Sequence, residues 1–160
     1  MTTHWVDKFK GYVFEEGDKS VDRYDTFADW WRSCQKPDEM ILLLEWVKYK
    51  DKGIYYHFAY WFVLCAMRLI KDEESVDVLN IVVRYFLLDA TYYEDLEIAW
   101  KAAWGDSVEM PVKPTWGIEW TSLWTAIGAV KIATEREGKR AVGEALCADI
   151  IRECISADIS

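Results

Sequence analysis

Hydrophobic residues recur every three or four positions along most of the chain, which is the spacing of one face of an α-helix. Prolines, glycines and short polar runs separate the periodic segments from one another. We predict helices at about residues 26–34, 37–50, 54–70, 72–88, 91–104, 118–137 and 139–154. The sequence therefore predicts an all-α fold, a single-domain bundle of six or seven helices.

Helix starts are marked by residues that form caps. Thr26 precedes Asp29 by three positions, and Thr91 precedes Glu94 by three, so each hydroxyl can accept the later backbone N–H. Pro37 suits a first helical turn, where the missing N–H costs no intrahelical hydrogen bond. The predicted helix starts at 26, 37 and 91 rest on these signals.

Two of the predicted helices carry features that bear on packing. Segment 54–70 is apolar on nearly all sides, which is typical of a helix in the middle of a bundle. Segment 72–88 is rich in β-branched and aromatic residues, but its length and apolar spacing favour a helix over a strand. Arg68 and Arg84 lie within these apolar segments. Each guanidinium either extends outward into solvent or forms an internal ion pair that fixes helix register, and for the structure we favour the ion pair.

The first 24 residues give no single prediction. Their apolar residues fit one helix face, but Gly11 lies inside it, and a short strand or hairpin around residues 12–14 is an alternative. We therefore treat residues 1–24 as an N-terminal extension whose structure the sequence leaves open. Residues 25–160 form the predicted helical domain.

A loop and an aromatic stripe lie next to each other in the last third of the chain. Residues 105–117 contain two glycines and two prolines, and a loop of this length is often functional. Trp116, Trp120 and Trp124 follow at steps of four, which places them on one helix face. We expect these tryptophans to lie in the core, and a binding patch on the surface is the second interpretation.

Composition limits the class of protein. The chain has 160 residues, of which 52% are hydrophobic, with ten Trp, nine Tyr and six Phe, enough to build one large core. Its longest apolar runs are too short to span a bilayer of about 30 Å. The four cysteines show no close spacing, so a cytoplasmic protein with reduced thiols is the simplest expectation.

Charge is the feature that points most directly to function. The chain has 28 acidic and 19 basic residues, and residues 72–109 hold ten acidic and two basic ones, a net charge of −8 against −9 for the whole chain. Such an acidic stretch fits a basic protein partner, and it disfavours direct binding of nucleic acid. The predicted partner-binding residues are Asp72, Glu73, Glu74, Asp77, Glu94, Asp95 and Glu97, with Trp116 and Trp120 as anchors.

No catalytic or metal-binding motif competes with this interpretation. The only histidines are His4 and His57, and His57 lies eight residues from Cys65, about 12 Å along a helix. Cys147 and Cys154 are seven residues apart, which is too far for two ligands of one zinc on a straight helix. No glycine-rich phosphate loop is present. We therefore expect a protein without enzymatic activity, cofactor or metal.

Several short runs carry a resemblance to a known family. Residues 25–34 contain a threonine, two tryptophans and a cysteine, and an acidic and then leucine-rich run follows at 38–44. Later runs lie at residues 65–68, 84–85, 89–96 and 147–152. In these runs the chain resembles alanine-rich, all-helical proteins of bacteria and phages, several of which are described as immunity proteins. The resemblance spans about residues 25–155 and implies an all-helical protein that neutralises another protein by binding it.

Charge and resemblance together suggest a hypothesis for the function. We expect a non-enzymatic inhibitor that binds a toxin or nuclease of phage–host or interbacterial conflict through an acidic surface. One alternative is a DNA mimic, which would space its carboxylates like phosphates along an elongated face. Another is a ligand-binding or enzymatic protein with an aromatic pocket that holds His57 or Arg68. A homo-oligomer is a further alternative, because surplus aromatic residues also form self-interfaces.

Overall fold

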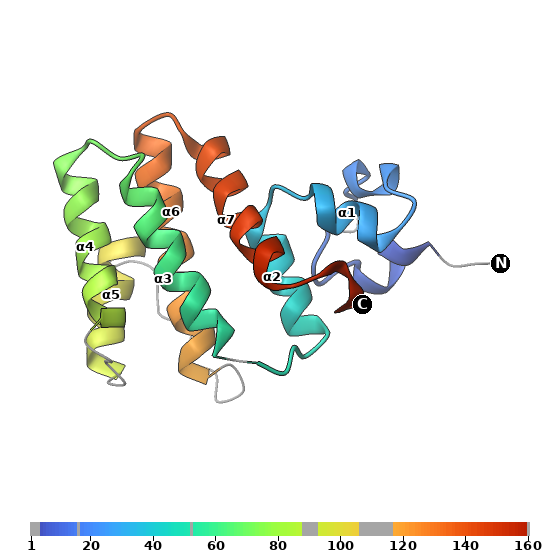
Figure 1. Cartoon of the computed structure of the whole chain (residues 1–160), viewed down its shortest axis with the longest axis horizontal. Helices are drawn as coiled ribbons and strands as arrows, with labels where there is room; N and C mark the ends of the chain where they lie inside the picture. Colours follow the sequence, from blue (N-terminus) through green and yellow to red (C-terminus); the bar gives the residue numbers. More distant parts are fainter. Residues whose placement is uncertain (1–3, 16, 52, 88–92, 106–116, 160) are drawn as a thin grey trace. The chain divides into compact units, whose positions relative to one another are not determined.

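The predicted all-α fold is confirmed. A computed structural model of the chain describes residues 4–15, 17–51, 53–87, 93–105 and 117–159, and these residues contain seven α-helices and no β-strand (Figure 1). The helices are α1 (Phe27–Ser33), α2 (Pro37–Trp46), α3 (Ile54–Met67), α4 (Glu73–Leu87), α5 (Tyr93–Trp104), α6 (Gly117–Arg136) and α7 (Arg140–Cys154). Short 3₁₀ helices span Trp5–Phe9, Ser20–Arg23 and Ala157–Ile159.

The helices belong to two compact units. The first unit comprises Met1–Lys50 and Cys147–Ser160, and the second comprises Asp51–Leu146. Helices α1 and α2 therefore lie in the first unit and α3 to α6 in the second, while α7 begins in the second and ends in the first. Each unit has its own buried apolar residues.

Aromatic rings form the core of the first unit. Trp5 and Phe14 each pack against Trp30, with ring centroids 5.8 and 5.3 Å apart, and Trp5 also contacts Phe27 at 5.8 Å. Edge and tilted contacts of this kind stabilise aromatic pairs beyond their simple burial. Residues from both sides of the expected boundary at residue 24 thus contribute to one aromatic cluster.

The described residues of this segment, 4–15 and 17–24, adopt neither a long helix nor a hairpin. Their two 3₁₀ helices are separated by a turn at Gly11, whose φ of 82° favours glycine. One isolated bridge joins Lys10 to Phe14, and the N–H of Gly11 donates to the carbonyl of Phe14 at 2.8 Å. The sequence left helix and hairpin open, and the structure has a tight aromatic turn instead.

Most of the predicted caps are present where they can be described. The Thr26 hydroxyl accepts the N–H of Asp29 at 3.1 Å, and Pro37 occupies the first turn of α2. Helix α2 ends at Trp46, earlier than expected, because Lys48 adopts a left-handed φ of 52° that interrupts the helix. The Thr91 cap lies outside the described residues.

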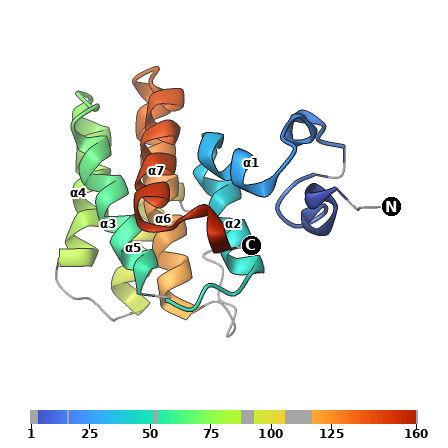
Figure 2. The same cartoon turned by 45° about the vertical axis from the view of Figure 1, so that its right-hand side comes forward.

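The second unit is built around four helices. Helix α3 packs along α6, and α5 contacts both α4 and α6. Helices α3 and α4 lie side by side in both views (Figure 1; Figure 2). The buried face of α3 carries Tyr55, Phe58, Ala59, Phe62, Val63 and Ala66.

One expectation about these helices holds in part and another is wrong. Helix α3 packs against both α4 and α6, but it is not buried on all sides, since His57 is exposed and Trp61 keeps 42% of its surface accessible. Aromatic residues on a solvent face made the sequence pattern look uniformly apolar. Arg68 and Arg84 are both exposed, which contradicts the internal ion pair that we favoured and agrees with the alternative of side chains that extend into solvent.

One corner of the second unit is held by two oppositely charged side chains. The Glu137 carboxylate accepts the backbone N–H groups of Lys71 and Asp72, both at 2.7 Å, just before α4. The Lys139 ammonium donates to the carbonyl of Leu69 at 3.1 Å, just after α3. The turn at Gly138, with a φ of 68°, places both side chains beside the α3–α4 corner. Together they satisfy backbone groups that the two helix ends leave unpaired.

The Glu137 interaction predicts a pH dependence of stability. The two backbone N–H groups lower the pKa of Glu137 below its usual value of about 4.5. A lowered folded-state pKa gives stability that is present above the unfolded-state pKa and lost as pH falls through the folded-state pKa. We expect Glu137→Gln to make thermal unfolding less sensitive to pH between about 5 and 3. Glu135→Gln, at an exposed position in the last turn of α6 where the carboxylate makes a weak surface contact with Arg140 at 3.9 Å, should keep the wild-type pH profile.

Candidate functional site

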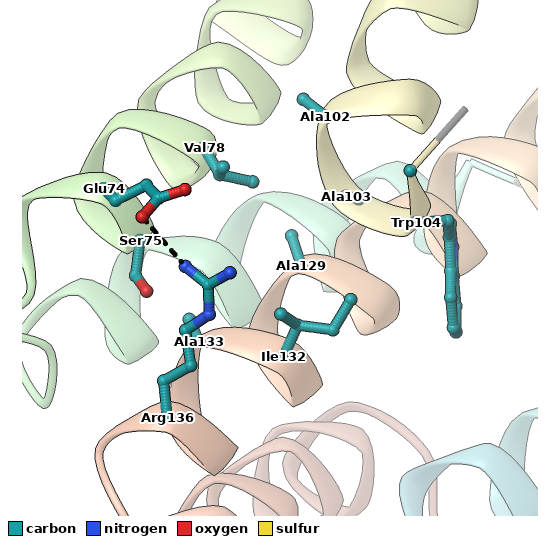
Figure 3. Close-up of a pocket in the computed structure, with 11 residues that line it drawn as sticks. Glu74, Ser75, Val78, Ala102, Ala103, Trp104, Ala129, Ile132, Ala133 and Arg136 are labelled. Carbon is teal, nitrogen blue, oxygen red and sulfur yellow. Dashed lines mark ion pairs between the residues drawn. The ribbon is translucent and has the colours of Figure 1, made fainter. Parts of the chain in front are cut away.

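A small cavity lies between the start of α4, the end of α5 and the C-terminal half of α6. Its volume is about 280 Å³, and all of its lining residues belong to the second unit. The apolar lining consists of Val78, Ala102, Ala103, Ala129, Ile132 and Ala133. We call this space the α4–α5–α6 cavity, and Figure 3 shows the side chains around it.

The end of α5 and helix α6 come into close contact beside this cavity. The Trp104 indole lies directly against Gly128 of α6, where an added Cβ would come within 2.2 Å of the ring. The same indole donates its Nε1–H to the carbonyl of Trp124 at 3.2 Å. Trp104 also lines the cavity, on the side opposite Glu74 and Arg136 (Figure 3). Gly128, which has no side chain, therefore allows the Trp104 indole on this side of the cavity to lie directly against α6.

Charged residues lie on the α4 side of the cavity. Glu74 and Arg136 line it, with the Glu74 Oε2 and an Arg136 guanidinium nitrogen 3.6 Å apart (Figure 3). The same guanidinium is 3.9 Å from the Asp72 carboxylate. Both Glu74 and Arg136 are largely exposed, so this ion pair contributes at most about 1 kcal/mol to stability.

Asp72 caps helix α4, as the acidic sequence at the helix start suggests. Its carboxylate accepts the N–H of Ser75 at 3.0 Å and the Ser75 hydroxyl at 2.7 Å. These hydrogen bonds lower the pKa of Asp72, with a smaller contribution from Arg136. Glu73, Glu74 and Asp77 lie in the first turns of the same helix and are exposed. We call Asp72, Glu73, Glu74 and Asp77 the acidic rim.

The predicted acidic residues do not form one surface. Glu94, Asp95 and Glu97, here called the far-end group, lie at the start of α5, whereas the cavity is lined by the start of α4 and the end of α5. The two helices are therefore antiparallel. The acidic rim and the far-end group are separated by the length of α4, which has 15 residues and is about 20 Å long. A stretch that is continuous in sequence is thus divided between opposite ends of a helical hairpin.

Part of the predicted site lies outside what the structure describes. The helix positions of Glu94 and Asp95 are defined, but their side chains are not, and Trp116 lies outside the described residues. Glu97 is described, and its carboxylate is 3.4 Å from the Lys101 ammonium. The far-end group is therefore partly neutralised within its own helix.

Trp120 is a core residue. Only 4% of its surface is accessible, and its ring contacts those of Tyr55 and Trp124 at centroid distances of 5.8 and 5.6 Å. This confirms the first interpretation of the tryptophan stripe for this residue. The expectation that Trp120 anchors a partner is wrong for this conformation, because a buried indole offers no contact surface.

The thiols and histidines show no catalytic arrangement in the described part of the chain. No disulfide joins the four cysteines, all of which lie among the described residues, and burial raises the pKa of Cys34 to about 12, which makes its thiol a poor nucleophile. His57 is exposed on α3 and contacts Trp61 at a ring distance of 6.2 Å. Neither His57 nor Arg68 lines the α4–α5–α6 cavity. No group of three or more His, Cys, Asp or Glu residues suited to a metal occurs among the described residues.

A second cavity lies in the first unit. Its volume is about 360 Å³, and its lining includes Arg23, Tyr24, Lys36 and Glu39. The Lys36 ammonium lies 3.6 Å from the Glu39 carboxylate, whose pKa burial raises. The arginine guanidinium stacks over the Tyr24 ring at 4.7 Å. Lys36 is paired with Glu39 and Arg23 with Tyr24, and among the described residues this cavity has no group of exposed, like-charged residues beside it comparable to the acidic rim.

Sequence reasoning found the acidic rim but missed the cavity beside it. Ala129 and Ala133 are four residues apart on α6, and small residues at that spacing are the available signal for a hollow face. No sequence pattern indicated that Ala102, Trp104 or Arg136 would join them, because their proximity depends on the packing of three helices.

Comparisons with known proteins leave the function to be inferred from these features. No protein-family model, curated protein or solved structure matches the chain. None of the described helices combines the length and the apolar character needed to cross a membrane. The acidic rim and the α4–α5–α6 cavity are therefore the features on which a functional proposal rests.

Proposed function

We propose that this protein is a non-enzymatic inhibitor that binds a basic protein effector through the acidic rim. The effector class is a toxin or nuclease of phage–host or interbacterial conflict, as the resemblance to immunity proteins implies. The observation that carries the proposal is the concentration of four exposed carboxylates around the start of α4, next to an open cavity. Complementary charge of this kind steers a partner and aligns it.

The acidic rim supports this role better than the far-end group does. The two groups are about 20 Å apart, which is more than twice the Debye length of about 8 Å at physiological ionic strength. Charges so far apart act nearly independently on an exposed surface. A partner that docks on the rim and cavity therefore gains little from the far-end group.

The ion pairs of Arg136 do not prevent a partner from using the rim. Arg136 lies near both Asp72 and Glu74, but its side chain is 49% exposed. Exposed pairs are weak, so the cations of a partner can replace Arg136 at low cost. One arginine also leaves the rim with a net negative charge.

The alternatives have less support. A DNA mimic needs closely spaced charges along a continuous face, because duplex DNA carries one charge per about 1.7 Å. The seven predicted acidic site residues lie instead in two groups at opposite ends of a hairpin. An enzyme with His57 or Arg68 in a pocket has no support from the α4–α5–α6 cavity, which contains neither.

Two charge-matched variants test the proposal. The rim variant combines Glu73→Gln, Glu74→Gln and Asp77→Asn, and the far-end variant combines Glu94→Gln, Asp95→Asn and Glu97→Gln. Asp72 is kept because it caps α4. Each variant removes three charges near the start of a helix, so the local effect on helix stability is matched.

The measurement is quantitative capture of basic proteins from a lysate of the native host, with wild type and both variants as baits. We expect a basic protein that the wild type and the far-end variant retain and the rim variant loses by about tenfold. Addition of the wild-type chain should then inhibit the activity of the captured protein. Equal capture by all three baits would show that the rim is not the binding surface.

A further inference from the structure

We infer that the α4–α5–α6 cavity receives one long cationic side chain, a lysine or an arginine, from the basic partner. This inference rests on the proposed function and adds the chemistry of the central contact. It places the aliphatic stem of that side chain along α6 and its charged group beside Glu74. Three properties of the cavity support it, namely its size, its charge and the position of Arg136.

The size of the cavity fits a single side chain. Its volume of about 280 Å³ lies just below the roughly 300–1,000 Å³ of clefts that enclose drug-sized ligands. Its floor is formed by Ala129, Ile132 and Ala133 of α6 (Figure 3). Lysine and arginine bury an aliphatic stem against such apolar surface while the charged group stays at the rim.

The charge around the cavity favours a cation. Glu74 lines the opening and is 79% exposed, and Asp72, Glu73 and Asp77 lie within two turns of the same helix. The C-terminal ends of α5 and α6, at Gly105 and Arg136, add the negative ends of two helix dipoles, and the carboxylates of the acidic rim more than offset the positive end that the start of α4 brings to the cavity. A carboxylate entering the cavity would meet this negative potential, whereas an ammonium or guanidinium would be attracted.

Arg136 already shows the geometry that we infer for the partner. It belongs to α6, lines the cavity, and directs its guanidinium toward the Glu74 carboxylate (Figure 3). The cavity volume remains open with this side chain in place. Arg136 therefore acts as an internal competitor for Glu74 that an incoming cation must displace. Its removal should strengthen the binding of a cation, whereas it would weaken the binding of an anion.

The experiment uses a small probe, so that it does not depend on the identity of the partner. The full chain is titrated with Nα-acetyl-lysine methylamide, and the Trp104 indole N–H is followed by nuclear magnetic resonance. Nα-acetyl-norleucine methylamide, which has the same stem without the ammonium, is the control ligand. We expect saturable binding of the lysine probe with a Kd of millimolar order and at least fivefold weaker binding of the norleucine probe.

Adjacent glutamates provide a matched pair of variants. Glu73 and Glu74 are both exposed in the first turn of α4, but only Glu74 lines the cavity. We expect Glu74→Gln to weaken the lysine probe by about fivefold, Glu73→Gln by less than twofold, and Arg136→Gln to strengthen it severalfold. Ala102→Leu, at a half-buried position, should abolish the Trp104 response, with circular dichroism to verify the fold.

Each other outcome has a defined meaning. Equal weakening by Glu73→Gln and Glu74→Gln, or equal shifts with both probes, would overturn the inference. Loss of lysine-probe binding in Arg136→Gln would contradict the role of Arg136 as a competitor for Glu74 and overturn the inference. If the lysine probe does not bind while capture of a basic protein still depends on the acidic rim, the inference about the cavity is wrong and the proposed function stands. If the probe binds as expected but capture is independent of the rim, the proposed function falls.

Discussion

Substitution of Gly128 by alanine will lower the free energy of unfolding by about 3 kcal/mol, the upper end of typical overpacking effects. The new methyl group would lie 2.2–2.5 Å from three atoms of the Trp104 indole, so either the indole must rotate or the end of α5 must move away from α6. Displacement of the indole also removes its hydrogen bond to the carbonyl of Trp124. Chemical denaturation followed by circular dichroism measures this effect.

The destabilisation caused by Gly128→Ala should disappear or reverse when the Trp104 ring is removed. In a Trp104→Ala background the space beside Gly128 is open, and alanine is favoured over glycine in a helix interior by about 1 kcal/mol. We therefore expect Gly128→Ala to be neutral or stabilising there. Gly17→Ala is the control, because a Cβ at Gly17 meets nothing within 4 Å. Destabilisation by Gly128→Ala in both backgrounds would contradict the direct contact with Trp104.

Substitution of Arg152 by alanine will lower the free energy of unfolding by about 2–3 kcal/mol, as expected for hydrogen bonds that involve a charged group. The guanidinium donates to the carbonyl of Trp31 at 3.2 Å and to the carbonyl of Cys34, at the end of α1. It also pairs with Asp149 at 2.6 Å. A cation at a helix C-terminus satisfies orphan carbonyls and interacts favourably with the helix dipole.

Two further variants separate the role of Arg152 from general packing. Arg152→Lys keeps the charge but not the planar fork, so it should recover part of the stability. Trp31→Phe removes the indole donor to the Ile155 carbonyl, a neighbouring buried hydrogen bond of 3.1 Å, at a cost of about 1 kcal/mol. Thermal unfolding measures the stability of the three variants, Arg152→Ala, Arg152→Lys and Trp31→Phe. An Arg152→Ala variant as stable as wild type would show that the cap of α1 contributes nothing.

The sequence predicted helices well because their determinants are local. Periodic apolar positions, the Thr26 cap, Pro37 and the stop at Gly105, whose φ is 87°, each act within a few residues. The early end of α2 was missed because Lys48 adopts a left-handed conformation that lysine seldom takes. The cap at Arg152 was missed because its partners lie more than a hundred residues away.

The candidate site was only half predictable for the same reason. The four residues of the acidic rim are close in sequence and lie together at the start of α4. The far-end group is also close in sequence, but the antiparallel packing of α4 and α5 places it at the other end. Alanines such as Ala102 and Ala129 are favourable in any helix, so only tertiary packing shows that they line a cavity.

The most direct test of the central claim is the affinity of the captured basic protein for the rim variant and the far-end variant, measured side by side at physiological salt. We predict that the rim variant binds about tenfold more weakly than wild type and that the far-end variant stays within twofold. Equal losses in both would show that total charge matters and not its location. An unchanged affinity of the rim variant would contradict the acidic rim as the binding surface.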